Sequence, residues 1–301
     1  MHRELDAIKK ALFGRYEVRK TVKQKAAFAD WAISQAQTLG YDTVIERSGK
    51  WFDTRNILIG DAVRARILIT AHYDTCACMP LGNTYTPECW PIIILTQLIL
   101  PCALYMLLCV WLSVVAGTLV SAAALLLLLF GPANPHTAND NTSGVALLLL
   151  LLHAFQGRTD VAFVLFDNEE IGLLGSSAFI KAHMQAARRA FVLNLDCVSD
   201  GDMLMLAGSP RAMRSVKGKH LSRALEETAP ACGKRWKTGE WMRVLYPSDQ
   251  LLFPYGAAFA ALKGKRILYM DRIHSARDTV FDDSNLLCLM QVIQTAFGEN
   301  A

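Results

Sequence analysis

One uncharged stretch constrains the fold of this 301-residue chain more than any other feature. It runs for 40 residues, from Pro91 to Phe130, without a single Asp, Glu, Lys or Arg. As one helix it would be ~60 Å long at 1.5 Å per residue, whereas the hydrocarbon core of a bilayer is about 30 Å thick. The run therefore predicts two crossings joined by a turn between Trp111 and Gly117, with Trp90 and Trp111 at the interfaces.

A buried core hairpin or a protein-binding patch is the alternative to a membrane hairpin. Uninterrupted apolar runs of this length are rare in soluble cores, so the sequence favours the membrane and makes the lipid bilayer a predicted partner. The segment Met1–Lys25 is charged and amphipathic and lacks the apolar core of a signal peptide. We therefore expect an integral membrane protein whose remaining domain is cytoplasmic.

Outside this run, strongly apolar strands alternate with helical patterns. The predicted strands are Tyr41–Glu46, Asn56–Ile59, Arg66–Thr70, Val161–Phe166, Phe191–Leu195 and Ile267–Met270. The predicted helices include residues 3–39, Ser143–Phe155 and Leu221–Glu227. Such alternation is typical of an α/β fold with a mostly parallel central sheet flanked by helices. We expect one such domain from residues 1–89 and 132–301, with residues 90–131 inserted as a two-helix transmembrane hairpin.

The charge and cysteine content exclude two other classes of protein. The net charge is only +4, and the basic residues form no long run, so no nucleic-acid partner is expected. The eight cysteines show no disulfide-framework spacing and are predicted to be free thiols. The pair Cys76-Ala-Cys78 could bind metal, but its spacing is tighter than that of the usual zinc-binding pair.

Potential metal ligands stand just after several predicted strands. They are His72 and Asp74 after Arg66–Thr70, Glu169 and Glu170 after Val161–Phe166, Asp196 after Phe191–Leu195, and His274 after Ile267–Met270. In open α/β sheets the carboxyl ends of the strands form the ligand-binding edge. Carboxylates beside such apolar strands are costly unless a cation pairs with them. Nitrogen and oxygen ligands of this mixture suit zinc, with cobalt or manganese as substitutes.

The same residues fall into five ordered motifs that resemble those of the M28 metallopeptidases. The motifs are His72-Tyr-Asp74-Thr, Ala138-Asn-Asp140-Asn-Thr-Ser-Gly144, Phe166-Asp-Asn-Glu169-Glu170-Ile-Gly, Asn194-Leu-Asp196 and Ile273-His274-Ser-Ala-Arg-Asp278-Thr. That family contains the co-catalytic zinc aminopeptidases. The segment Ser248–Gly256 also resembles a family segment, but Gln250 stands where a histidine is common.

The resemblance implies a role for each of these positions. The ligands of two zinc ions would be His72, Asp140, Glu170, Asp196 and His274. Asp140 would bridge the ions, with His72 and Asp196 on one and Glu170 and His274 on the other. The implied activity is that of a zinc metallopeptidase, a hydrolase, acting on a peptide or a small N-terminal aminoacyl substrate.

Two acidic residues would have roles other than binding metal. Glu169 would be the general base. It would take a proton from the water molecule that becomes the metal-bridging hydroxide, and it would pass this proton to the leaving amine. Asp74 would orient His72 and raise its basicity. Two alternatives remain open: a glutaminyl-cyclase-like acyl transferase, and a non-catalytic membrane scaffold of the same fold.

Overall fold

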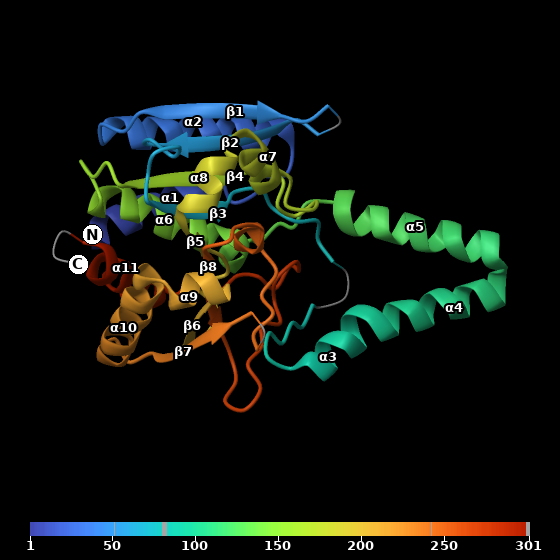
Figure 1. Cartoon of the computed structure of the whole chain (residues 1–301). Coiled ribbons are helices and arrows are strands. Elements are labelled where there is room, and N and C mark those ends of the chain that lie inside the picture. Colours follow the sequence, from blue (N-terminus) through green and yellow to red (C-terminus); the bar gives the residue numbers. More distant parts are fainter. Residues whose placement is uncertain (51, 80–82, 242, 299–301) are drawn as a thin grey trace.

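A mixed β-sheet runs through the main body of the protein (Figure 1). The structure is a computed structural model, and it describes residues 1–50, 52–79, 83–241 and 243–298. Within these residues the sheet has eight strands, in the spatial order β1-β2-β4-β3-β5-β8-β6-β7. They are β1 (Thr43–Ser48), β2 (Thr54–Ile59), β3 (Ile67–His72), β4 (Val161–Phe166), β5 (Phe191–Leu195), β6 (Met203–Gly208), β7 (Arg235–Glu240) and β8 (Gly256–Leu262).

The sheet combines parallel and antiparallel pairs, and its centre is parallel. Strands β4, β3, β5 and β8 pair in parallel, whereas β1, β2 and β4 pair antiparallel, as do β6 and β8. Strands β6 and β7 at one edge also pair in parallel. Every residue of β3, β4 and β5 is buried, which is the usual state of parallel strands covered on both faces. The predicted α/β class is confirmed, and four of the seven strand pairs in this mixed sheet are parallel.

Helices cover both faces of the sheet. One face carries α1 (His2–Arg15), α2 (Val22–Thr38), α6 (Gly144–Ala154), α9 (Pro210–Arg214), α10 (Val216–Ala231) and α11 (Asp283–Phe297). The other carries α7 (Leu174–Ala182) and α8 (Met184–Arg189). Helix α6 is apolar around its whole circumference because it lies between the sheet and the other helices, and Gly144–Leu152 is buried throughout.

Two predicted elements are wrong. The helix expected over residues 3–39 is broken, because Thr21 caps a second helix and forms a capping box with Gln24. The segment Ile267–Met270 is not a strand of the sheet and makes only isolated bridges. The apolar side chains of Leu268 and Met270 pack beside β8 and β6 instead.

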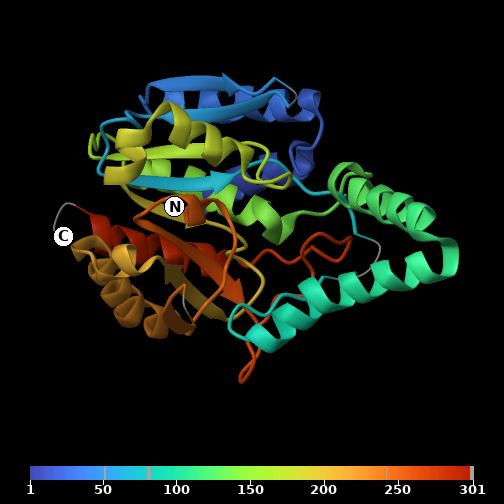
Figure 2. The same cartoon turned by 45° about the vertical axis from the view of Figure 1, so that its right-hand side comes forward.

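The uncharged run forms a helical hairpin that projects from the body, on the side away from the two termini (Figures 1 and 2). Its first arm is a continuous helix made of α3 (Trp90–Ile94), the π-helical η1 (Leu95–Ile99) and α4 (Leu100–Leu112). The chain turns at Ser113, within the predicted range, and returns as α5 (Val114–Phe130). Gly117 lets the arms approach closely, since an added Cβ there would lie 2.7 Å from the Cys109 nitrogen.

The two arms differ in length. The first, Trp90–Leu112, has 23 residues and is long and apolar enough to cross a membrane. The second, Val114–Phe130, has 17 residues, below the ~20 residues that a crossing typically takes. Among the described residues only the first arm meets both criteria, so the structure does not support the prediction of two full crossings.

The foot of the hairpin is fastened to the body near the start of α2. The Lys20 ammonium donates to the carbonyl of Leu129 at 3.0 Å, where α5 ends. The Phe130 ring stacks on Phe52 with 5.7 Å between ring centres. A cation at the last carbonyls of a helix is favourable, so Lys20 stabilises the end of α5.

Candidate metal centre

The predicted ligands meet at the carboxyl edge of the parallel strands. His72 is the last residue of β3, Asp196 follows β5, and Glu170 follows β4. Asp140 lies in η2 (Ala138–Ser143), the irregular turn that leads into α6. His274 comes from a loop after β8, in which it adopts a positive φ of 57°. The chain therefore gathers five side chains from five segments at one place.

Three of these side chains form a first group. His72 Nε2 lies 3.3 Å from Asp140 Oδ1 and 3.6 Å from Asp196 Oδ1. All three side chains are at least nine-tenths buried. One imidazole and two carboxylates facing a common point form a donor set that suits a zinc ion.

A second group shares one member with the first. His274 Nε2 lies 3.0 Å from Asp140 Oδ2 and 3.3 Å from Glu170 Oε2. Asp140 thus directs one carboxylate oxygen toward each histidine. A carboxylate placed in this way has one oxygen available to each of two ions.

Glu169 and Glu170 are held by their backbone rather than by their side chains. The Asp74 carboxylate accepts the amide of Glu169 at 3.0 Å and the amide of Glu170 at 3.2 Å. The same carboxylate lies 3.6 Å from His72 Nδ1, beyond hydrogen-bonding distance, while the Asp74 carbonyl lies 3.2 Å from that nitrogen. In this structure, therefore, Asp74 positions the two glutamates more directly than it orients His72.

Burial and crowding shift the protonation of the whole cluster. Burial raises the pKa of Glu170 to about 8 and that of Glu169 well above its usual range. Burial lowers the pKa of His274, but Glu170 and Asp140 outweigh it and raise that pKa to about 10. The same competition, with Glu169 as the largest favourable charge, raises the pKa of His72.

Unpaired oxygens in this pocket fit a bound cation. Oε1 of Glu170 and Oδ1 of Asp196 are buried and accept no hydrogen bond from any described residue. Leaving charged acceptors buried and unsatisfied is costly. A metal ion in each group would pair with these oxygens, and the imidazole and carboxylate donors are those that zinc prefers.

The sequence did not assign a role to Asp278, although Asp278 closes the last motif. Its carboxylate accepts the amides of Asn139 at 2.8 Å and Asp140 at 3.0 Å, and its carbonyl accepts from Ala138. Burial raises the pKa of Asp278 to about 7. Asp278 fixes the turn that carries Asp140, a role that only the fold reveals.

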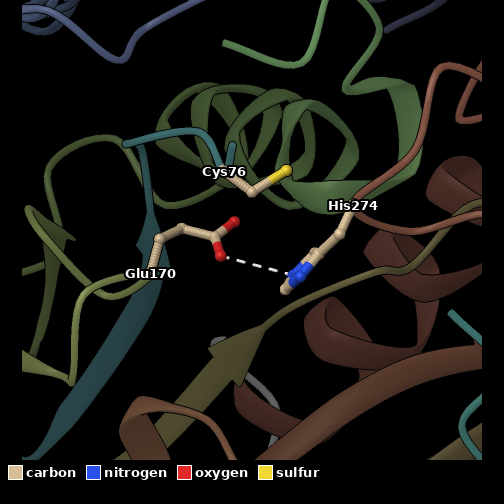
Figure 3. Close-up of side chains that lie close together, drawn as sticks. All are labelled: Cys76, Glu170 and His274. Carbon is tan, nitrogen blue, oxygen red and sulfur yellow. Dashed lines mark ion pairs between the residues drawn. The ribbon is translucent and has the colours of Figure 1, made fainter. Parts of the chain in front are cut away.

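Two further groups lie near the cluster, and neither was among the predicted ligands. Asp249 is fully buried, and both its carboxylate oxygens lack a hydrogen-bond partner among the described residues. The Cys76 sulfur lies beside Glu170 and His274 (Figure 3). Burial, with the charges of Glu170 and Asp140, raises the pKa of the Cys76 thiol well above its usual value. All eight cysteines lie in the described part of the chain, and none forms a disulfide.

A cavity of about 220 Å³ opens onto the cluster. His72, Asp140, Glu169, Asp196 and His274 line it together with Gln97, which belongs to η1 of the hairpin. Gln250 does not line it, because its side chain donates to the Tyr246 carbonyl at 2.6 Å and accepts from Asn194 at 3.1 Å. The residue that departs from the family pattern is therefore structural here.

Comparison with known proteins bears directly on this site. The sequence model of peptidase family M28 matches residues 57–294. The chain belongs to peptidase family M28. This match covers all of the candidate ligands and confirms the resemblance seen in the motifs. No curated protein sequence matched this M28 chain.

Several solved structures share the fold of this M28 protein. A glutaminyl cyclase from Porphyromonas gingivalis is 17% identical with a TM-score of 0.61, covering 100% of this chain and 96% of that one. A leucine aminopeptidase precursor from Bacteroides thetaiotaomicron is 16% identical with a TM-score of 0.64, covering 98% and 96%. A Zn-dependent exopeptidase from Parabacteroides distasonis is 14% identical with a TM-score of 0.62, covering 98% and 97%. At these identities the likeness establishes the fold alone.

Proposed function

We propose that this M28 protein is a two-zinc aminopeptidase that releases the N-terminal residue of a peptide. The observation that carries the proposal is the placement of Asp140, whose two oxygens face His72 and His274 separately. One zinc ion would bind His72, Asp140 and Asp196, and the other would bind Asp140, Glu170 and His274. Cobalt or manganese would serve as substitutes. When bound, the ions would polarise the scissile carbonyl and acidify the attacking water.

Glu169 is the proton carrier in this proposal. It lines the cavity beside His72, and its buried carboxyl has a raised pKa. A carboxyl group with a raised pKa binds a proton more readily, which suits a group that takes up a proton and passes it on. The Asp74 carboxylate accepts a hydrogen bond from the Glu169 amide and so fixes the backbone from which the Glu169 side chain extends. Glu169 takes a proton from water and gives it to the leaving amine.

A glutaminyl-cyclase-like activity is the second candidate, because structures of two glutaminyl cyclases align with 100% and 98% of this chain. Both reactions act at a peptide N-terminus, so the products distinguish them. An aminopeptidase releases a free amino acid, whereas a cyclase converts an N-terminal glutamine and releases ammonia. A non-catalytic scaffold would do neither.

The test is a panel of aminoacyl-anilides, dipeptides and N-terminal glutamine peptides, assayed with zinc-loaded and cobalt-loaded protein. We expect free amino acids to be released and two metal ions per chain to be bound. Ammonia release without amino-acid release would replace the aminopeptidase with a cyclase. If the protein binds no metal and releases neither product, the non-catalytic scaffold is the remaining alternative.

We also propose that residues 90–131 enter the bilayer as a hairpin, while residues 1–89 and 132–301 form the catalytic domain on the cytoplasmic side. The last three residues of that range lie outside the described residues. The support is the exposed apolar surface of the hairpin, where Val110 is 82% exposed and Trp111 79% exposed. Such a surface calls for lipid or protein cover. Trp111 at the tip and Trp90 at the foot suit the two interfaces.

This membrane proposal bears on the substrate. Because Gln97 of the hairpin lines the catalytic cavity, the cavity opens at the foot of the proposed membrane segment. The side chains Leu95 and Leu98, next to Gln97, are about half exposed. A peptide entering here would pass the bilayer surface, so apolar peptides that partition to that surface are the substrates we propose.

A further inference from the structure

The Cys76 sulfur lies at the second group of candidate ligands, where the sequence motifs place no cysteine. Cys76 Sγ and donor atoms of Glu170 and His274 all lie within 4.8 Å of one another. Figure 3 shows the three side chains together, with the ion pair between Glu170 and His274. Two donors on one tetrahedral zinc ion are about 3.3–3.7 Å apart, given bonds of ~2.0–2.3 Å. A shift of about 1 Å would therefore bring the sulfur into the same shell.

The surroundings of the sulfur favour a ligand rather than a packing residue. Cys76 is 3% exposed, yet it faces acidic and imidazole groups instead of an apolar core. The Asn134 amide donates toward the sulfur at 3.7 Å, and a sulfur that accepts a hydrogen bond suits a thiolate. Asn134 is itself fixed, because it also donates to the Ser275 carbonyl at 3.0 Å. Independently, Glu170 Oε1 is buried here without a hydrogen-bond partner, which points to a cation.

We propose that Cys76 is a direct ligand of the second metal ion, joining Asp140, Glu170 and His274. This proposal rests on the two-zinc function proposed above. On binding, the thiol loses its proton to solvent and the sulfur donates a lone pair to the ion. The second ion would then have four protein donors and the first would have three, so the first ion would have the more open position for water. Because thiolate is a soft ligand, this site selects zinc or cadmium over manganese.

The experiment follows the metal rather than the activity. Full-length protein is stripped with a chelator and reloaded with cadmium or cobalt, and two readouts are taken: ions bound per chain, and the thiolate-to-metal charge-transfer band in the ultraviolet. The variants are Cys76→Ser and Cys76→Ala, with Cys78→Ser and Cys197→Ser as controls. Cys78 is the neighbouring thiol outside the cluster, and Cys197 is a buried thiol that lines the cavity.

We expect the band in the wild-type protein and in Cys78→Ser, and its loss in both Cys76 variants. Loss of a hydrogen-bonded neighbour of a ligand typically costs 10–100-fold in metal affinity, so losing a direct ligand should weaken the second ion by at least about tenfold. Manganese should compete better with zinc in Cys76→Ser than in the wild type. A retained melting transition shows that a variant is folded.

Each other outcome overturns a defined part of the proposal. Two bound ions without a charge-transfer band in the wild type would remove Cys76 from the shell and leave the two-zinc function intact. A band that survives in Cys76→Ser but is lost in Cys197→Ser would assign the sulfur to the other thiol. If the wild-type protein binds no metal, both this inference and the proposed function fail.

Discussion

At the scale of single residues, Asp140 is the position on which both candidate metal groups depend. Its oxygens lie 3.3 Å from His72 Nε2 and 3.0 Å from His274 Nε2. In Asp140→Asn, an amide nitrogen replaces one oxygen and the charge is lost, so both ions should bind more weakly. His72→Ala and His274→Ala should each lose mainly one ion. Metal analysis of the purified variants checks this order, and two tightly bound ions in Asp140→Asn would contradict bridging.

Glu169 gives the complementary prediction. Glu169→Gln keeps the size of the side chain and the amide that Asp74 holds, but cannot accept a proton. We expect turnover to fall ~10²–10⁴-fold while the metal content stays that of the wild type. Steady-state kinetics and metal analysis on the same preparation decide the matter. Unchanged turnover with metal bound would remove Glu169 from the proton path.

His72, Glu170 and Asp196 could be predicted from the sequence because each lies at or just after the end of a buried strand. Asp140 and His274 follow no strand of the sheet, and only their motifs indicated them. The supporting contacts could not be predicted. Asp278 holds the Asp140 turn across 138 positions of the sequence, and Cys76 approaches Glu170 only because two loops fold together. The role predicted for Asp74 was too narrow for the same reason, since its contact with the Glu169 amide spans 95 positions.

At the scale of secondary structure, the loop after β4 that carries Glu169 and Glu170 is tied to α2 by a buried ion pair. Lys25 Nζ lies 2.8 Å from Asp167 Oδ1 and donates to Asn168 Oδ1 at 2.7 Å. The two charged side chains are 7% and 0% exposed. Removing one partner of a buried pair leaves an uncompensated charge and typically costs ~3–5 kcal/mol.

We therefore expect Lys25→Met to lower the free energy of unfolding by about 3 kcal/mol or more. The double variant Lys25→Met with Asp167→Asn should recover much of this loss, because no buried charge is then left unpaired. Lys23→Met, on the exposed face of the same helix, should change stability by less than ~0.5 kcal/mol. Denaturant titrations of the four proteins test this. Equal losses in both single variants would show that the ion pair does not matter.

The elements that sequence patterns missed share a physical cause. β8 is Gly-Ala-Ala-Phe-Ala-Ala-Leu, and alanine favours helices over strands, so only its place beside β5 and β6 makes it a strand. β7 is a partly exposed edge strand with alternating polar residues. Ile267–Met270 has a strand-like composition, but Gly264 at φ 97° begins a turn just before it. Burial in the core and pairing with neighbouring strands determine whether these segments form strands. Neither can be recognised from the local sequence.

At the scale of the whole molecule, the membrane proposal predicts which surfaces share a compartment. The hairpin leaves the body after His72 and returns before Asp140. The Nε2 atom of His72 lies 3.3 Å from Oδ1 of Asp140. Both feet must therefore be on one side of the bilayer, whatever depth the tip reaches. Ser113→Cys at the tip should react differently from Lys50→Cys on the body when intact cells are treated with an impermeant thiol reagent.

A reporter fused to the C-terminus should agree with position 50 and not with position 113. Labelling is compared with the parent protein, whose own cysteines set the background. Equal labelling at 50 and 113 would show that the tip does not cross, and the hairpin would then be a surface-seated or protein-covered element. If the reporter lies on the side of the membrane opposite to position 50, residues 1–89 and 132–301 cannot form one domain.

The position of the hairpin in the sequence also determines when, during synthesis, the residues of the candidate site can come together. A ribosome releases His72 and Asp74 first, then the whole apolar insert, and only afterwards Asp140, Glu170, Asp196 and His274. Neither metal group is complete until the insert has folded back on itself. A newly made chain whose hairpin has not folded back therefore keeps His72 and Asp74 apart from the other residues of the candidate site.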